Sequence, residues 1–326
     1  MIIAEVGSVH DGSFGNAKKL VECAAQKGAD AIKFQTHISE AETTKYASSP
    51  SYFNSEARYE YFKRTSFNKK QWIELKKIAQ SNNIKFLSSP FSLEAVDLLE
   101  EIGQEIYKIP SGEVTNFPLL KKIAELGKPV LLSSGMSNWA ELDKAVSFFK
   151  NKCDLTVMQC SSIYPCPPEK VGLNIISEMK TRYSCNIGFS DHTEGISAPL
   201  AAAALGATVI EKHLTFSKLM YGSDAKHSME PDEFSKMVKL IKEVWQIMNN
   251  KVDKNNLKDV EAMKDIFQKS IVAKNKLQSG SFIKESDLAY KKPGTGLSAS
   301  KFEEIIGMQI TRDFEKDELI LKDFLI

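Results

Sequence analysis

The segment CNIGFSDHTEGISAPLAAAALGATVIEKHLT (residues 185–215) decides the fold of this chain. It begins with a strand-like run that ends in a polar cluster at His192. It then passes through helix-forming sequence and closes with a second strand-like run that carries His213. Parallel strands joined in this way bring their carboxyl ends to one edge of a sheet. Because imidazole is a common ligand of divalent metals, the two histidines predict a metal centre at that edge.

The same alternation of strand and helix patterns runs through the first 215 residues. The predicted strands are residues 2–7, 30–36, 84–90, 105–111, 129–135, 155–162, 185–191 and 208–214. Eight such alternations predict an α/β fold, the (β/α)8 or TIM barrel. Residues 37–64 are too many for a routine loop, so we interpret them as an insertion that covers the substrate.

The length of 326 residues fits one barrel with a small appendage. We predict a barrel domain over 1–250, a linker over 251–269 and a small β-rich domain over 270–326. A module of this size holds only a marginal core of its own, so we expect it to pack on the barrel or on another subunit.

Composition excludes several functional classes. The chain has 43 basic and 42 acidic residues, and a net charge of +1 gives no sign of nucleic-acid binding. No uninterrupted apolar run reaches the length of a membrane span. The five cysteines show no CxxC spacing and are expected to be reduced thiols, which favours a cytoplasmic protein.

Polar residues follow nearly every predicted strand, at the edge where TIM-barrel enzymes place their chemistry. Lys33 and Lys108 lie within apolar strand sequence, where an unpaired ammonium is costly. Two lysines among serine hydroxyls suit a phosphate and a carboxylate on one small ligand. Glu211, two residues before His213, suits a general base for water, with a simple salt bridge as its alternative.

Eight ordered motifs resemble the bacterial sialic acid synthase family, which includes N-acetylneuraminate, legionaminic acid and pseudaminic acid synthases. They are AEVGSVHDGS (4–13), IKFQTH (32–37), FLSSPF (86–91), YKIPSGE (107–113), LLSSGM (131–136), IGFSDHT (187–193), IEKHLT (210–215) and KKPGTG (291–296). The resemblance implies a barrel followed by an antifreeze-like (SAF) domain. It also implies condensation of phosphoenolpyruvate with an N-acylated hexosamine, giving a nine-carbon ulosonic acid and phosphate.

The resemblance also implies a role for each matching residue. The implied phosphoenolpyruvate ligands are Lys33, Ser89, Lys108, Ser111, Ser162 and Ser190. The implied sugar ligands are Gln35, Tyr164, Asp224 and Lys292, and the implied catalytic residues are Glu5, Lys108, Glu113 and Glu211. One Mn²⁺ or Mg²⁺ per site is expected on His192 and His213. The implied assembly is a domain-swapped homodimer.

Two positions depart from the family pattern. Ser162 stands where many members have asparagine, and Lys292 stands where sialic acid synthases have an arginine that contacts the N-acetyl group of the sugar. Lysine keeps the charge but lacks the planar fork of arginine. The acceptor therefore stays open between N-acetylmannosamine and a diacetamido sugar of the legionaminic or pseudaminic type.

Two other classes of protein remain as alternatives. One is a pyruvate aldolase that forms a Schiff base through Lys33, Lys108 or Lys212. The other is a non-catalytic binding protein built on the C-terminal module, against which the lysines in the barrel strands argue, because a scaffold has no need of them.

Overall fold

The computed structural model describes residues 1–49 and 56–326. These form two compact units, Met1–Asn250 and Lys251–Ile326, each with its own core. Residues 50–55 of the predicted insertion lie outside the described residues.

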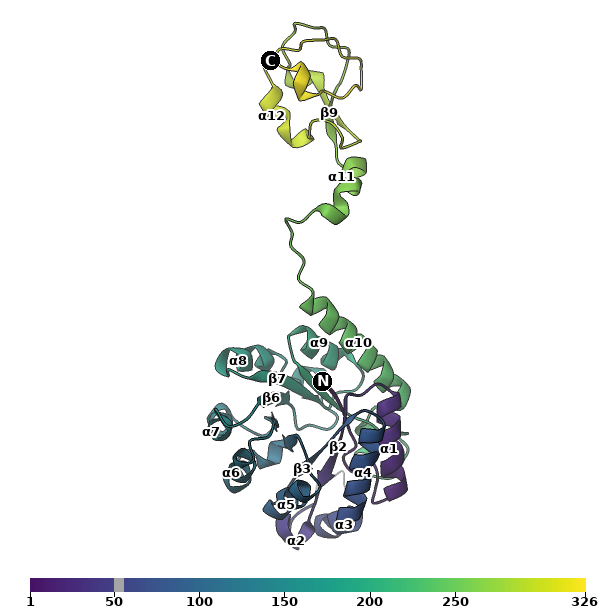
Figure 1. The fold of residues 1–326 in the computed structure, drawn as a ribbon, viewed down its shortest axis with the longest axis vertical. Helices are drawn as coiled ribbons and strands as arrows, with labels where there is room; N and C mark the ends of the chain where they lie inside the picture. Colours follow the sequence, from purple (N-terminus) through teal and green to yellow (C-terminus); the bar gives the residue numbers. More distant parts are fainter. Residues whose placement is uncertain (50–55) are drawn as a thin grey trace. The chain divides into compact units, whose positions relative to one another are not determined.

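The first unit is a closed barrel of eight parallel strands in chain order (Figure 1). The strands are β1 (Ile2–Glu5), β2 (Ala31–Thr36), β3 (Lys85–Pro90), β4 (Tyr107–Ile109), β5 (Val130–Ser133), β6 (Leu155–Cys160), β7 (Asn186–Asp191) and β8 (Val209–His213). The last strand closes the barrel by pairing Glu211 with Ile3 and His213 with Glu5. All eight predicted strands are confirmed, and the TIM barrel with them.

A ring of helices surrounds the strands (Figure 1). It comprises α1 (Phe14–Gln26), α4 (Lys69–Ser81), α5 (Leu93–Glu101), α6 (Phe117–Glu125), α7 (Trp139–Phe149), α8 (Asn174–Arg182), α9 (Ser197–Ala204) and α10 (Pro231–Asn249). Asn68 and Asn138 begin α4 and α7 with reciprocal capping boxes, which satisfy backbone N–H groups that the helix itself leaves unpaired. Buried apolar residues of these helices, such as Leu20 of α1 and Leu120 of α6, pack in the core between the helices and the barrel.

The interior of the barrel has an apolar floor, separate from the core beneath the helices. It is one buried cluster of Ile3, Ala31, Leu87, Ile106, Leu131, Met158 and Val209. Side chains alternate along a strand, so the next inward residue lies two positions further on. That step gives a polar layer above the floor, made of Glu5, Lys33, Ser89, Lys108, Ser133, Cys160 and Glu211.

The insertion between β2 and α4 contains two short helices, α2 (Ser39–Glu42) and α3 (Arg58–Thr65). Tyr61 and Phe62 of α3 are buried, so the described part of the insertion packs on the barrel.

The second unit is a small β-rich domain. It contains α11 (Glu261–Phe267), which lies within the stretch where we predicted a linker, the antiparallel strands β9 (Ser270–Ala273) and β10 (Leu288–Lys291), and α12 (Phe302–Ile305). Its core consists of Ile271, Ala273, Ile283, Leu288, Ile305, Ile310, Phe314 and Ile320.

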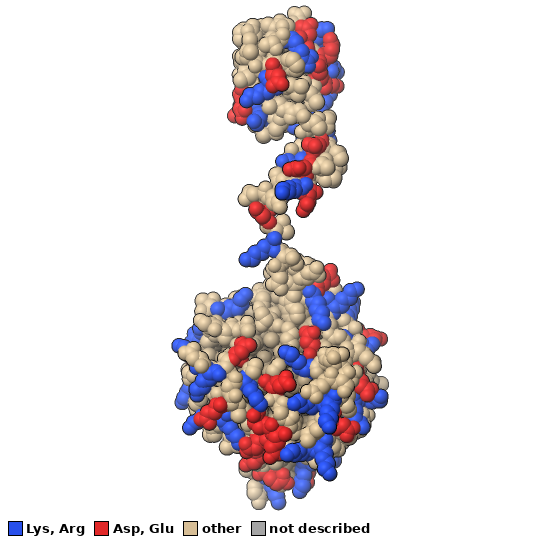
Figure 2. Space-filling view, viewed as in Figure 1, with Lys and Arg blue, Asp and Glu red and all other residues tan. Residues whose placement is uncertain are grey.

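Acidic and basic side chains are interspersed on the face of the molecule that Figure 2 shows, without a large patch of one sign. This distribution agrees with the net charge of +1. Among the described helices, none has the length and apolar character that spanning a membrane requires.

Candidate active site

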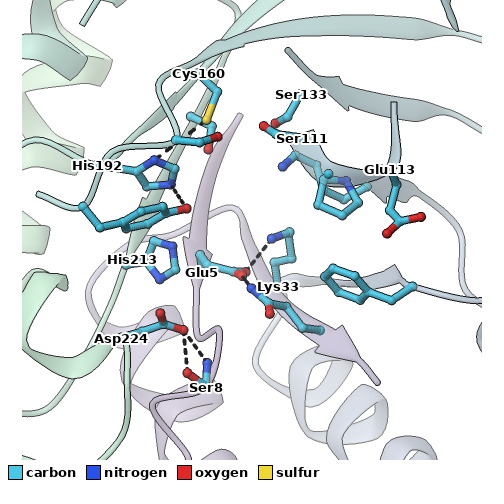
Figure 3. Close-up of a pocket in the computed structure, with 18 of the residues that line it drawn as sticks. Glu5, Ser8, Lys33, Ser111, Glu113, Ser133, Cys160, His192, His213 and Asp224 are labelled. Atoms are coloured by element: carbon cyan, nitrogen blue, oxygen red, sulfur yellow. Dashed lines mark hydrogen bonds and ion pairs between the residues drawn. The ribbon is translucent and has the colours of Figure 1, made fainter. Parts of the chain in front are cut away.

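A cavity of about 440 Å³ opens at the carboxyl ends of the barrel strands (Figure 3). Thirteen of the residues predicted for the site line it: Glu5, Lys33, Gln35, Lys108, Ser111, Glu113, Ser162, Tyr164, Ser190, His192, Glu211, His213 and Asp224. They come from strands or strand ends spread over more than 200 residues of sequence. Only closure of the barrel brings them together.

A buried network of charges forms the base of the cavity. Glu211 Oε1 lies 3.2 Å from Lys33 Nζ and 3.3 Å from Lys108 Nζ, so one carboxylate oxygen serves both ammonium groups. Lys33 also lies 2.8 Å from Glu5 Oε2, and Gln35 donates to Glu5 Oε1 at 2.7 Å. The lysines are therefore paired, and the network contributes no large excess of charge.

The two lysines differ in their electrostatic environment. Burial disfavours the ammonium of Lys33, but Glu211 and Glu5 together outweigh that cost and raise its pKa. Burial lowers the pKa of Lys108, whose single carboxylate partner only partly compensates. The pKa of Glu211 is lowered, because Lys108 and Lys33 overcome the effect of burial. A bound anion would therefore stabilise the ammonium form of Lys108 more than that of Lys33.

Two buried oxygen atoms that face the cavity have no hydrogen-bond partner in the described part of the chain. They are Glu211 Oε2 and Ser133 Oγ. Buried polar atoms are normally paired, so both are available to a bound molecule.

Backbone also approaches the cavity closely at Gly135. Its N–H donates to Ser111 Oγ at 3.0 Å. A Cβ at this position would lie 2.5 Å from Ser162 Oγ and 2.8 Å from Ser111 Oγ. Glycine therefore keeps open a cradle of hydroxyl groups beside the lysines, a set of donors that suits an anion.

The two predicted metal-binding histidines lie in the cavity wall with their ring centroids 5.5 Å apart (Figure 3). The Nδ1 of His192 contacts the carbonyl oxygen of Ser161 at 2.7 Å, and its Nε2 contacts the hydroxyl of Tyr164 at 2.9 Å. His213 Nδ1 is buried without a partner among the described residues. Burial lowers the pKa of both histidines, which favours the neutral imidazole that ligates metals.

No group of three or more His, Cys, Asp or Glu side chains in the described ranges is arranged to hold a metal ion. An ion on the two imidazoles would have to take its remaining ligands from water or substrate. Such an open site is typical of catalytic metals.

Asp224 is fixed beside His213 by the loop after β1. It accepts hydrogen bonds from the backbone N–H of Ser8 at 2.8 Å and from its hydroxyl at 2.7 Å. A Cβ on Gly7, which adopts a φ of +52°, would lie 2.4 Å from Asp224 Oδ2. Glycine is needed here for both its conformation and its lack of a side chain.

Three predicted residues lie outside the cavity wall. Ser89 is fully buried in the polar layer, and its hydroxyl has no partner among the described residues. Lys292 belongs to the second unit, where its Nζ lies 4.8 Å from the centre of the Phe267 ring. Lys212, the third lysine of the aldolase alternative, turns away from the cavity and pairs with Asp191.

Several residues that line the cavity were not predicted, among them Ser8, His37, Arg58, Cys160 and Ser223. Cys160 lies two positions beyond Met158 of the floor, so the alternation of the strand could have identified it. The others lie in loops or in the insertion, where no such periodicity applies.

Comparisons with known proteins agree with this architecture. A model of the NeuB family matches residues 20–253, and a model of the SAF domain matches residues 268–326. The chain belongs to the NeuB family. The resemblance found in the sequence and the small C-terminal SAF domain are both confirmed.

Individual relatives cover nearly the whole chain. It is 40% identical to N,N'-diacetyllegionaminic acid synthase of Campylobacter jejuni over 98% of each chain. It is 32% identical to human N-acetylneuraminate-9-phosphate synthase over 99% of this chain and 92% of the human one. The crystal structure of the N-acetylneuraminic acid synthetase of Leptospira borgpetersenii, in complex with citrate, is 35% identical. It superposes with a TM-score of 0.71 over 80% of this chain and 89% of that one.

The pair of Lys212 and Asp191 holds the ends of β7 and β8 together behind the histidines. Lys212 also donates to the carbonyl of Thr193, whose N–H and hydroxyl donate to Asp191. Replacing Lys212 by methionine leaves a buried carboxylate without its counter-ion. We expect this to lower the free energy of unfolding by about 3–5 kcal/mol in urea denaturation.

Lys218→Met is the control for that change, because Lys218 is a nearby lysine on the surface. Its effect should stay within about 0.5 kcal/mol. Equal stability of Lys212→Met and the unchanged protein would show that the buried pair contributes nothing to the fold.

Proposed function

We propose that this protein is a synthase that condenses phosphoenolpyruvate with an N-acylated hexosamine, giving a nine-carbon ulosonic acid and phosphate. The observation that carries the proposal is the meeting, in one cavity, of a lysine and serine cradle for an anion with two neutral histidines suited to a metal. Family membership and relatives named as synthases of sialic, legionaminic and pseudaminic acids support it.

Phosphoenolpyruvate fits the side of the cavity that contains Lys33, Lys108 and the hydroxyls around Gly135. It carries a phosphate and a carboxylate, and this side offers two ammonium groups and the serines Ser111, Ser162 and Ser190. The two lysines are already paired with Glu5 and Glu211. We therefore propose that the phosphate and carboxylate of the substrate bind ammonium groups that keep their contacts with those two side chains. Ser133 Oγ gains a partner when an anion binds.

A divalent metal, Mn²⁺ or Mg²⁺, would be held by His192 and His213 and would polarise the aldehyde of the open-chain sugar. Tyr164 and Asp224 flank these histidines, and we propose that they bind hydroxyl groups of the acceptor. Gln35, fixed by Glu5, lines the same part of the cavity.

We propose that Glu211 takes the proton of the water that attacks C2 after C3 of phosphoenolpyruvate has bonded to the aldehyde carbon. Its Oε2 has no hydrogen-bond partner in the part of the chain that the structure describes, and the lysines on Oε1 keep the carboxylate ionised. Loss of phosphate from the resulting tetrahedral centre, by cleavage of the C–O bond, completes the reaction. Lys108 can stabilise the charge that develops on the departing phosphate.

The direct test is release of inorganic phosphate from phosphoenolpyruvate in the presence of Mn²⁺ and an acceptor. The acceptors are N-acetylmannosamine and a 2,4-diacetamido hexose, and the product is identified by its mass. Phosphate release that requires an acceptor, with a product nine carbons long in its backbone, is the expected result. Release without an acceptor, or none with any sugar, contradicts the proposal.

The lowered pKa of Lys108 favours one second candidate, an aldolase that forms a Schiff base with pyruvate, because a less basic lysine is more often the free amine. Borohydride reduction in the presence of pyruvate separates the two. A synthase of the proposed kind gives no increase in protein mass, whereas an aldolase gains a covalently attached adduct on Lys108.

The cradle at Gly135 yields a prediction about substrate binding. In Gly135→Ala, the new methyl group crowds Ser111 and Ser162 and removes one or two hydrogen bonds to an anion. We expect KM for phosphoenolpyruvate to rise roughly ten- to one-hundredfold, with KM for the sugar within about twofold. Gly15→Ala, where the new Cβ would meet only Ser13 Oγ at 3.9 Å, an ordinary contact, is the matched control. A rise in KM for the sugar alone would show that this side of the cavity binds the sugar and not phosphoenolpyruvate.

The histidines yield a prediction about metal. Chelation should abolish turnover, and Mn²⁺ should restore it. His213→Ala should lower kcat by roughly three orders of magnitude, because polarisation of a carbonyl is worth several kcal/mol. Titration calorimetry should show that Mn²⁺ binds the unchanged protein and not the variant. His227→Ala, outside the cavity wall, is the control. Full activity of His213→Ala in metal-free buffer contradicts the assignment.

For the assembly, we propose the homodimer that the family resemblance implies, in which Lys292 of one subunit acts at the cavity of the other. Lys292 is exposed within its own unit and makes no ion pair with described residues, so its ammonium is available. Mixing the inactive variants Glu211→Ala and Lys292→Ala should restore part of the activity, because one site of the mixed dimer is then complete. A monomer by light scattering would contradict this arrangement.

A further inference from the structure

The insertion contributes a guanidinium to the cavity wall whose Nε has no hydrogen-bond partner among the described residues. Arg58, the first residue of α3, lines the cavity, and its Nε is buried without a hydrogen-bond partner in the described ranges. No carboxylate of the described residues lies within ion-pair distance of it. A buried N–H donor left unpaired is destabilising, so a built donor of this kind indicates a ligand that accepts from it.

Aromatic rings form a rigid surface next to Arg58. Its guanidinium carbon lies 5.5 Å from the centre of the Phe62 ring. Phe62 stacks on His37 with centroids 3.6 Å apart, and His37 stacks on Phe91 at 4.1 Å. Glu42 and Gln35 contact the two nitrogens of His37 at 2.8 and 3.1 Å, which fixes the middle ring of the stack. This side of the cavity is therefore both apolar and preorganised.

Glu113 supplies an acceptor on the same side. It follows β4, lines the cavity and is held by Asn116, whose side chain donates to Oε2 at 2.7 Å. Burial raises the pKa of Glu113, and Arg58 and Glu42 are its nearest charged influences besides. A fixed donor, a fixed acceptor and an apolar surface thus lie around one part of the cavity.

We propose that Arg58 and Glu113 form a subsite for an uncharged acylamino group of the acceptor sugar. This inference rests on the proposed function. The guanidinium donates to the carbonyl oxygen, the carboxylate accepts from the amide N–H, and the alkyl part packs on Phe62 and Phe91. An amide has one acceptor, one donor and an apolar end, and the wall offers the complement of each.

The charges near this wall disfavour an anionic substituent. Glu113 lines the cavity together with Arg58, and Glu42 lies behind the wall against His37, so a phosphate or carboxylate on the sugar gains no net attraction from the three groups. Arg58 also offers what the lysine at position 292 lacks, a planar set of N–H donors. The barrel itself thereby recognises the substituent for which other family members are expected to use their C-terminal domain.

The test replaces Arg58 by methionine and by lysine in the full-length protein. Arg64→Met on the same helix is the control, because Arg64 is exposed and pairs with Asp11 and Glu56. KM for N-acetylmannosamine and for a 2,4-diacetamido hexose is measured by phosphate release. Saturation-transfer NMR on the acetyl methyl protons measures contact without turnover.

We expect Arg58→Met to raise KM for at least one of these sugars roughly ten- to one-hundredfold, with KM for phosphoenolpyruvate within about twofold. The saturation-transfer signal of the sugar's acetyl methyl protons should weaken in this variant as well. The sugar KM of Arg58→Lys should lie between those of Arg58→Met and the unchanged protein, and the sugar KM of Arg64→Met should equal that of the unchanged protein. If Arg58→Met does not fold, Arg58→Lys alone decides.

Two outcomes separate this inference from the proposed function. Normal turnover with unchanged sugar constants and methyl signals in both Arg58 variants overturns the subsite and leaves the function standing. Absence of phosphate release by the unchanged protein with any acceptor overturns the function. In that case, a methyl signal that Arg58→Met removes still supports the subsite. A raised KM for phosphoenolpyruvate alone would assign Arg58 to the other substrate and overturn the inference.

Discussion

One oxygen atom, Oε1 of Glu211, is shared by the ammonium groups of Lys33 and Lys108, and the arrangement of the barrel interior depends on it. Two buried ammonium groups are tolerated only with counter-charges, and Glu5 supplies the second. The pairing compensates the buried charges and leaves Glu211 Oε2 without a hydrogen-bond partner among the described residues. An anion that binds here contacts ammonium groups that are already paired with carboxylates. Because the positions of these groups are already fixed, the protein need not reorganise when charge develops, which is the condition for electrostatic catalysis.

The strands could be predicted because their chemistry is periodic. An apolar residue in the floor and a polar residue two positions later recur around the barrel, as in Ile3 and Glu5 or Val209 and Glu211. Such a pattern identifies both the strand and the end at which chemistry occurs. It accounts for the strand residues among the thirteen that meet in the cavity, whereas Asp224, in the segment after β8, was predicted from the family resemblance alone. The same two-residue step, taken from Met158 of β6, would have added Cys160 to the predicted site.

The remaining parts of the site could not be read from the sequence, for a physical reason. Ser8 reaches Asp224 across 216 positions, and the pairing depends on the loop conformation that Gly7 permits. The stack of Phe62, His37 and Phe91 joins the insertion to two strand ends. No local periodicity records such contacts between distant loops. The predicted covering role of residues 37–64 indicated the right region, but not that Arg58 is the residue in the wall.

Residues from strands and residues from loops contribute to different sides of the cavity. The side proposed for phosphoenolpyruvate takes Lys33, Lys108 and Ser190 from strands, whose register is fixed by eight closed pairings, so a change there disturbs the barrel itself. The side proposed for the sugar is built largely from the insertion and the turns after strands, where substitutions cost the fold little. The relatives are named for different sugar acids, and we infer that the loops are where such differences are accommodated. The proposed function then assigns selection of the acceptor to residues such as Arg58 and Glu113, and binding of the donor to Lys33, Lys108 and Glu211.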